Sequence, residues 1–548
     1  MVVIDPALEK AAKGNIYLRE YIDELQKVTN ILPKYYENLS VKDLAEIRKN
    51  AILDPNSANV IYKIGNGHIH IDALRSRYVS IEHKLNMEEK EKLRMIKDSI
   101  LEKATHEESV ETKEDLIRIL EKLFDMSVEV VSGRNKKVKK TSGKVQVSQK
   151  EYEILKYYIN RDIVGYGPIE PLILDPYIED VHLIGTGKVR VSHKAFQYGL
   201  ETNVRFDDEV SLNEFFVSIS ERMGRPVSAS KPIVDGTLPD GSRINMIYST
   251  DISARGSSCT IRKFSAEPIS PIQLIKFGTF SPEFVAYIWL CLENKMNVIL
   301  SGETASGKTT ALNAILSFID HRGKIYSVED TPEVKPPQKG WQRCVTRESG
   351  PEEARVTMFD LLRAALRSRP DYIVIGEIRG EEGRVAFQCM QTGIPVMATF
   401  HASNATKFIQ RMTGQPINIP MSFIDNVNVI IFQSAVNVNR RFLRRVTNVE
   451  EFMGYSKEDG GVLTRNVFKW DSATDKLYFR GNNNSYILEK RIAAEHGYSE
   501  PKDIYKDLRQ REKIIQKMVD LDITGYHEVN KILSDYYEYG PNSLPFTV

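Results

Sequence analysis

Cysteine is scarce in this sequence, and its spacing does not suit metal binding. The 548 residues contain 4 cysteines, and no two of them form a C-x-x-C pair. They stand at Cys259, Cys291, Cys344 and Cys389. Such wide separation argues against a zinc site and against a disulfide framework. We therefore expect four reduced cysteines in apolar cores.

Long apolar runs are also missing. No stretch of about 18 consecutive apolar residues occurs, although a membrane-spanning helix needs roughly that length. The first residues, MVVIDPALEKAAKG, carry charge where a secretion signal needs an apolar core. We expect no membrane span and no export, which predicts a cytoplasmic protein.

An excess of charge of either sign is lacking as well. The chain has 75 basic and 74 acidic side chains, for a net charge of +1. A balanced charge gives no general reason to expect nucleic acid as the partner. With 41% apolar residues, the chain is ordinary globular material, long enough for about two to four domains.

The N-terminal quarter of the chain has helical patterning. Apolar residues recur every three to four positions over 8–25, 41–52, 87–105 and 113–124, which predicts a helical module over residues 1–130. Residues 131–144, VSGRNKKVKKTSGK, contain only basic charges and predict a basic linker over 131–147. Such a run is usually only solvated, but it could also touch anionic lipid headgroups.

A small α+β domain is predicted over residues 148–264. The pattern indicates helices at 149–160 and 210–223 and strands around VHLIG, KVRVSH and CTIRKF. Asp235-Gly236 and Asp240-Gly241 predict tight turns beside further strands. Pro268 and Pro271 place a hinge at 265–275, and residues 276–548 have mostly α/β patterning.

A phosphate-binding loop is the strongest motif. VILSGETASGKTT, residues 298–310, fits G-x-x-x-x-G-K-[ST] between an apolar strand and an amphipathic helix. In this motif backbone N–H groups surround the β-phosphate, Lys308 reaches the β/γ oxygens and the Thr309 hydroxyl ligates Mg²⁺. The residues predicted to contact nucleotide are Gly302, Glu303, Thr304, Ala305, Ser306, Gly307, Lys308, Thr309 and Thr310.

Carboxylates follow two later strands of this domain. The run 324–328 leads into Glu329 and then Glu333, at the carboxyl end of a strand, where α/β sheets bind ligands. These acids could only cap the next element, or could act near metal or water. The strand 372–375 is followed by Gly376, where the Walker B pattern has aspartate, and by Glu377. Glu377 is the predicted group for polarising water, holding the metal, or both.

A histidine ends the last strand-like run of the α/β domain. PVMATFHASNA delivers His401 just beyond its apolar residues. Most single histidines are structural, but this position also suits a sensor of the γ-phosphate.

These motifs together resemble the secretion ATPase superfamily, which serves type II secretion, type IV pili, type IV secretion and the archaeal flagellum. GETASGKTT, VEDTPE, LRSRPDYIVIGEIRGEE and TGIPVMATFHA are similar to its Walker A, Asp box, Walker B and His box. Two features differ from many members: Ile394 follows Gly393 in place of a Gly-His pair, and no tetracysteine insert follows the His box. The segment from Arg411 and the helical module are most similar to the archaellum motor ATPase.

The resemblance implies a fold and a mechanism. It implies a RecA-like P-loop ATPase domain preceded by a small α+β domain and a helical N-terminal module, with ATP and Mg²⁺ as cofactors. It also implies a homohexamer that sits at the cytoplasmic face of a membrane and acts on a polytopic platform protein. GSRINMIYS and TIRKF resemble the segments whose arginines reach the nucleotide, which makes Arg243 and Arg262 the candidates, with Arg255 a weaker third.

Other functions stay open at this point. An archaeal pilus assembly or secretion ATPase would share every motif above. A nucleic-acid translocase would also use a RecA-like ring, but no basic patch interleaved with aromatic residues accompanies the motor motifs. A small-molecule kinase would need an acceptor site and a lid, and neither is recognisable. A degenerate binding protein would not need Lys308, Thr309 and Glu377 together.

The two arginines generate a testable prediction. If Arg243 and Arg262 act on phosphate only after domain closure, removing either charge spares nucleotide affinity more than rate. We expect each arginine-to-alanine variant to lower kcat about ten- to a thousandfold in steady-state ATPase assays. An unchanged kcat in both variants would make them structural strand residues.

Overall fold

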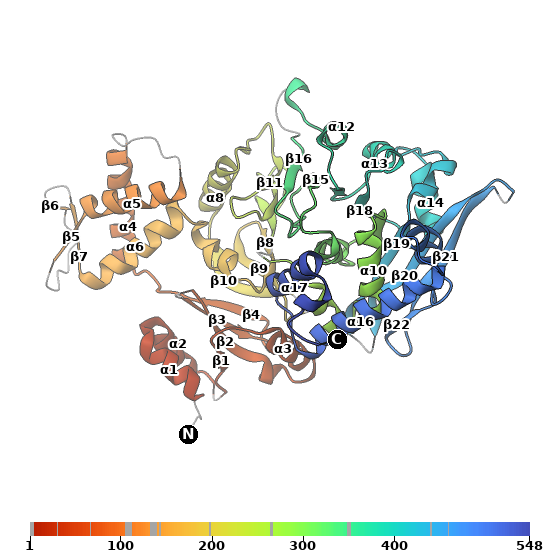
Figure 1. Cartoon of the computed structure of the whole chain (residues 1–548). Helices are drawn as coiled ribbons and strands as arrows, with labels where there is room; N and C mark the ends of the chain where they lie inside the picture. The colour runs from red at the N-terminus through yellow and green to blue at the C-terminus, as the bar shows by residue number, and fades with distance from the viewer. Residues whose placement is uncertain are drawn as a thin grey trace. The chain divides into compact units, whose positions relative to one another are not determined.

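The chain divides into two compact units, residues 1–264 and 265–548. The structure is a computed structural model that describes residues 5–29, 31–65, 67–104, 112–131, 140–141, 144–196, 199–263, 267–347, 352–438, 441–458 and 460–547. Figure 1 shows the elements along the chain. None of the helices in these ranges is both long and apolar enough to cross a membrane.

The first unit contains eight of the labelled helices and thirteen strands among its described residues. Its helices are α1 (Pro6–Gly14), α2 (Ile16–Gln26), α3 (Val41–Leu53), α4 (Met87–Ala104), α5 (Lys113–Ser127), α6 (Gln149–Ile163), α7 (Glu170–Leu174) and α8 (Glu209–Arg222). Its strands are β1 (Lys34–Tyr36), β2 (Asn59–Ile64), β3 (Gly67–Asp72), β4 (Arg77–Ile81), β5 (Val128–Val130), β6 (Lys140–Thr141), β7 (Lys144–Val147), β8 (Ile178–Ile184), β9 (Gly187–His193), β10 (Leu200–Phe206), β11 (Ile233–Thr237), β12 (Arg243–Ile247) and β13 (Ser258–Arg262).

The N-terminal module is helical only in part. All four predicted helical stretches contain helices, but β1 to β4 lie between them and join β8 to β13 in one ten-stranded sheet. The connection is the parallel pairing of β4 with β10. Tyr62 of β2 and Tyr78 of β4 donate to the buried carboxylate of Asp175 at 2.7 and 2.8 Å. Burial raises the pKa of Asp175, and the hydroxyls oppose that shift. Sequence periodicity missed these strands because each has only three to six residues and none shows a regular alternation of buried and exposed positions.

Two further sequence expectations in the first unit need correction. Asp235-Gly236 lies inside β11, paired with β12, so it is not a turn. Asp240-Gly241 is a turn, with Gly241 at a φ of +89°. The basic linker is interrupted by the strands β6 and β7, which pair with each other and with β5. The rest of its basic stretch, 132–139 and 142–143, lies outside the described residues.

The second unit is a three-layer α/β structure. Its helices are α9 (Pro271–Lys276), α10 (Pro282–Glu293), α11 (Lys308–Ile315), α12 (Met358–Ser368), α13 (Glu382–Gln391), α14 (Ala405–Thr413), α15 (Ala493–Glu495), α16 (Ile504–Asp520) and α17 (Tyr526–Tyr539). Its strands are β14 (Val298–Gly302), β15 (Ile325–Glu329), β16 (Trp341–Val345), β17 (Tyr372–Ile375), β18 (Val396–Phe400), β19 (Val429–Val438), β20 (Arg441–Ser456), β21 (Gly461–Asp471) and β22 (Lys476–Phe479).

Both faces of the nine-stranded sheet are covered, as a RecA-like domain requires. The strand order is β16-β15-β17-β18-β14-β19-β20-β21-β22, parallel from β16 to β19 and antiparallel beyond it. Val298 and Leu300 of β14 pack with α10, α11, α16 and α17, whereas Ile299 packs with α12, α13 and α14. Burial on both faces explains the continuous apolar runs from which these strands were predicted.

The four cysteines are all free thiols, as expected. Cys259, Cys291 and Cys389 are buried, and Cys344 is half-buried.

Candidate functional site

The phosphate-binding loop lies between the fully buried β14 and α11 and requires its glycines. A Cβ at Gly302 would lie 2.0 Å from the carbonyl oxygen of Gln433 on the neighbouring β19, so no larger residue fits there. Gly307 caps α11 at a φ of +92°, and Ala305 has a φ of +61°. This left-handed backbone points successive N–H groups inward, which forms an anion-binding concavity at the helix N-terminus.

Lys308 is buried and folds back over the loop. Its Nζ donates to the carbonyl oxygens of Gly302 at 3.0 Å and Glu303 at 2.8 Å. Burial lowers the pKa of Lys308, and the nearby charge of Glu377 opposes that effect. The ammonium therefore occupies a site where an anion would be electrostatically favourable.

The predicted acid and histidine are brought together at one edge of the sheet. Strands β15, β17, β18 and β14 are neighbours and parallel, so their carboxyl ends meet. His401 Nε2 lies 2.9 Å from one carboxylate oxygen of Glu377. Burial and then the charge of Lys308 lower the pKa of His401, with Glu377 opposing, so a neutral ring donates its Nε2–H to Glu377.

Arg379 is a site residue that the sequence motifs did not single out. Its Nη2 donates to the second oxygen of Glu377 at 2.5 Å, and its Nη1 lies 3.9 Å from Asp330. Both oxygens of Glu377 are therefore engaged by side chains. The available signal for Arg379 was its position two residues after Glu377.

Glu329 explains the glycine at the end of β17. A Cβ at Gly376 would lie 3.2 Å from Cγ of Glu329, so the Glu329 side chain fills the space beside this position. One carboxylate oxygen of Glu329 accepts the N–H groups of Glu333 and Val334, both at 2.7 Å. The other, Oε2, is buried and has no hydrogen-bond partner. Burial raises the pKa of Glu329 to about 7.

The remaining predicted site residues are placed less directly. Glu333 acts through its backbone, which donates to Glu329 and accepts from Asn313 at 2.9 Å. Arg243 and Arg262 face each other on β12 and β13, so their side chains share one face of the sheet of the first unit. Their predicted action on nucleotide stays a prediction.

Two residues of the second unit carry oxygen donors that suit a divalent cation. In the described part of the chain no three His, Cys, Asp or Glu side chains are grouped as a metal site. The free oxygen of Glu329 and the hydroxyl of Thr309 are the hard donors that Mg²⁺ prefers. Glu377, predicted as a ligand, has its carboxylate occupied by Arg379 and His401.

Two pockets of the second unit differ in how well they suit a nucleotide. The first, about 450 Å³, is bounded by Gly302, Glu303 and Thr304 of the loop, by His401, Ala402 and Ser403, and by Lys407, Gln410 and Arg411 of α14. It adjoins the phosphate-binding loop and is lined by cationic side chains. Arg411 also donates to the carbonyl of His401 and lies over the ring of Phe400.

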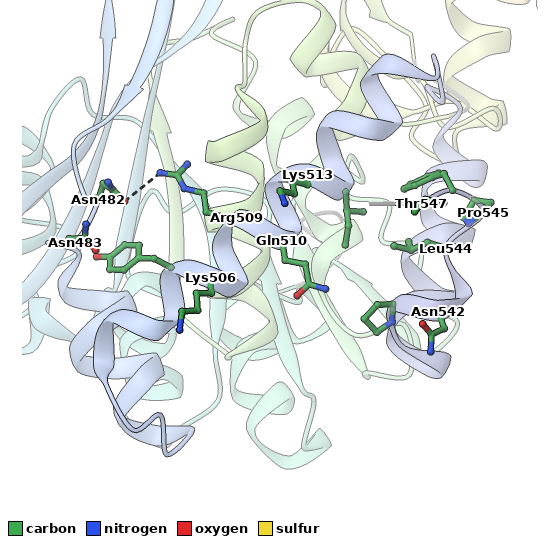
Figure 2. A pocket seen from close by; sticks show the side chains of 14 residues that line it. Asn482, Asn483, Lys506, Arg509, Gln510, Lys513, Asn542, Leu544, Pro545 and Thr547 are labelled. Carbon is green, nitrogen blue, oxygen red and sulfur yellow. Dashed lines mark hydrogen bonds between the residues drawn. The ribbon is translucent and has the colours of Figure 1, made fainter.

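The second pocket is larger, about 1100 Å³, and lies along α16 and the C-terminal segment (Figure 2). Its Arg509 is paired with Glu283 and Glu512, and its Lys506 is paired with Asp503. It has no glycine loop. The smaller pocket is therefore the one that suits a nucleotide phosphate.

Comparison with known proteins identifies the family. Residues 162–485 match the model of the type II/IV secretion system protein family. An uncharacterized protein of Methanocaldococcus jannaschii is 47% identical over 100% of both chains. The type IV secretion system protein VirB11 of Bartonella quintana is 27% identical over 38% of this chain and 67% of its own.

Solved structures give weaker matches. The VirB11 ATPase of the Brucella suis type IV secretion system is 21% identical, with a TM-score of 0.27 over 52% of this chain and 91% of that chain. The pilus retraction motor PilT with bound ADP is 18% identical, with a TM-score of 0.38 over 69% and 96%.

The identification rests on the family match, on the full-length relative and on the geometry of the phosphate-binding loop. The chain belongs to the type II/IV secretion system protein family and is an ATPase of that family.

Proposed function

We propose that this ATPase is the motor of an archaeal surface appendage and that the appendage is the archaellum. ATP hydrolysis at this site is supported by one observation: the Glu377 carboxylate lies between His401 and Arg379 beside the phosphate-binding loop. The absence of a tetracysteine insert, the segment that begins at Arg411 and the N-terminal module favour the archaellum motor within the family.

Hydrolysis would follow from the residues already at the sheet edge. The loop N–H groups bind the phosphates, and Lys308 exchanges two backbone carbonyls for the β/γ oxygens. Glu377 would then orient the attacking water, and His401 would sense the γ-phosphate. Arg379 pairs with one oxygen of Glu377 and would hold the carboxylate in place as it accepts a proton from the attacking water.

The donor set also fits Mg²⁺. We assign the ion to the Thr309 hydroxyl and to the free oxygen of Glu329, with Glu377 acting on water. When bound, the ion would neutralise charge that develops on the phosphates.

The assembly that we propose is a homohexamer at the cytoplasmic face of the membrane. Arg243 and Arg262 would reach the nucleotide on closure of the two units about residues 265–275, so loss of phosphate would release one unit from the other. The module of residues 1–130 would contact a polytopic membrane platform protein, with anionic lipid as a further partner of the basic linker.

An archaeal pilus assembly or secretion ATPase is the alternative function within the family. A nucleic-acid translocase is the alternative outside the family, and DNA-stimulated ATPase activity would reveal it.

Substitutions of Lys308 and Glu377 are expected to affect nucleotide binding and ATP hydrolysis differently. Lys308→Ala removes the charge that meets the phosphates, so nucleotide binding weakens and turnover is lost. Glu377→Gln retains ATP binding but lowers kcat by roughly a hundredfold or more, because only the water activation is removed. Equilibrium binding and steady-state ATPase assays distinguish the two. Glu381→Gln, which changes a carboxylate that makes no capping bond at the start of α13, is the matched control. Wild-type turnover in Glu377→Gln would remove Glu377 from this role.

Glu329 predicts a pH dependence. Its pKa is raised to about 7, so the carboxylate is mostly protonated below that pH and mostly ionised above it. If the ionised form holds the metal, kcat/KM of the wild type rises as pH increases through about 7, and Glu329→Gln lacks this rise. If Glu329→Gln shows the same rise in kcat/KM, a group other than Glu329 causes the pH dependence.

The archaellum assignment is tested in cells. A host in which Glu377→Gln replaces the wild-type chain loses swimming in motility assays but retains its pili and surface adhesion. Cells that still swim and instead lose pili and adhesion would establish the pilus function. Cells that keep swimming, pili and adhesion would reject both the archaellum and the pilus assignment.

A further inference from the structure

The phosphate-binding loop depends on side chains that satisfy its outward carbonyls. When the N–H groups of such a loop converge on an anion, the carbonyl groups point away from it. Three described side chains donate to them. Lys308 bonds Gly302 and Glu303, Ser306 Oγ bonds Glu303 at 2.8 Å, and Arg444 Nε bonds Ala305 at 3.0 Å. Ala305, at a φ of +61°, is the strained non-glycine residue of the loop.

Nucleotide binding removes one of these supports. Lys308 cannot keep both carbonyl bonds while its ammonium contacts phosphate. Ser306 belongs to the loop itself and bonds a residue only three positions away. Arg444, from β20, is then the donor that holds the loop from outside.

Arg444 is well placed for this function because its backbone is fixed. Its carbonyl oxygen accepts from Thr279 Oγ1 and from Arg445 Nη1, both at 3.0 Å. Arg445 is buried, binds both oxygens of Asp475 at 2.7 and 2.8 Å, and donates to the carbonyl of Phe277 at 2.9 Å. The same point of β20 therefore supports the loop and anchors residues 277–279, which follow α9.

The Arg444 side chain is exposed but lies close against the loop. A Cβ at Gly307 would lie 3.0 Å from Cδ of Arg444 and 3.0 Å from Nε2 of Gln433. Arg444 therefore lies beside Gly307 as well as Ala305.

We propose that Arg444 is a positioning residue of the ATPase site, which holds Ala305 in its nucleotide-binding conformation after Lys308 has turned to the phosphate. This inference rests on the ATPase assignment and not on the appendage that the motor serves. The Nε–H donor of Arg444, and not the positive charge of its guanidinium, supports the nucleotide-binding conformation of Ala305.

Two substitutions at this position separate donor from charge. Arg444→Gln places an amide nitrogen at the same distance along the side chain as the arginine Nε, without charge. Arg444→Met has similar length and no donor. The matched control is Arg465→Met on β21, which removes a half-buried arginine that also bonds a backbone carbonyl, that of Asn484, at 2.7 Å.

The measurements are the Kd for a fluorescent ADP analogue, kcat/KM for ATP, and the unfolding temperature without nucleotide. We expect Arg444→Met to weaken ADP binding and lower kcat/KM by about tenfold, because the hydrogen bond that holds Ala305 is lost. We expect Arg444→Gln and Arg465→Met to stay within about twofold of wild type. The unfolding temperature without nucleotide should change little in all three, since Lys308 still holds the empty loop.

Two results would overturn the proposal. Equal losses in Arg444→Gln and Arg444→Met would show that the charge acts on nucleotide. Unchanged ADP affinity in Arg444→Met would show that the bond to Ala305 does not position the loop. Both results are independent of whether cells need this chain for swimming.

Discussion

The second unit depends on holding an anion site open when no anion is bound. Converging N–H groups repel one another electrostatically, and the backbone that forms them includes left-handed residues at Ala305 and Gly307. The chain stabilises this arrangement by close approach of Gln433 to Gly302 and by side-chain donors on the outward carbonyls. Lys308 serves the loop in one state and, in the mechanism we propose, the phosphate in the other.

The carboxylates at the sheet edge are differentiated by their surroundings. Glu377 lies between a guanidinium and an imidazole, and is half-buried. Glu329 is buried, and its pKa is raised to about 7. One acid is therefore engaged by two side chains while the other is buried with one oxygen unpartnered, and in the mechanism we propose this difference gives them separate roles in water activation and metal binding. Gly376 belongs to the same arrangement, because a larger residue there would press on Glu329.

The first unit shows how distant segments of sequence can build one sheet. Strands β1 to β4 extend the sheet of β8 to β13, and the buried Asp175 receives hydroxyl groups from β2 and β4. Leaving those hydroxyl groups unpaired in an apolar core would cost about 1–3 kcal/mol each. The N-terminal strands and the α+β domain consequently share one hydrophobic core.

The sequence by itself determined the phosphate-binding loop and the strands beside it. The loop motif is local, and strands buried on both faces are continuous apolar runs, so β14, β15, β17 and β18 were predicted within a residue or two. The helices of the N-terminal module were predicted because their apolar residues recur every three to four positions. Tertiary structure alone decided what depends on contacts between distant residues: the pairing of β4 with β10, the two partners of Glu377, the buried oxygen of Glu329 and the contact of Arg444 with Ala305. These residues are separated by up to 139 positions, and no periodicity or spacing records which side chains a fold brings within hydrogen-bonding distance.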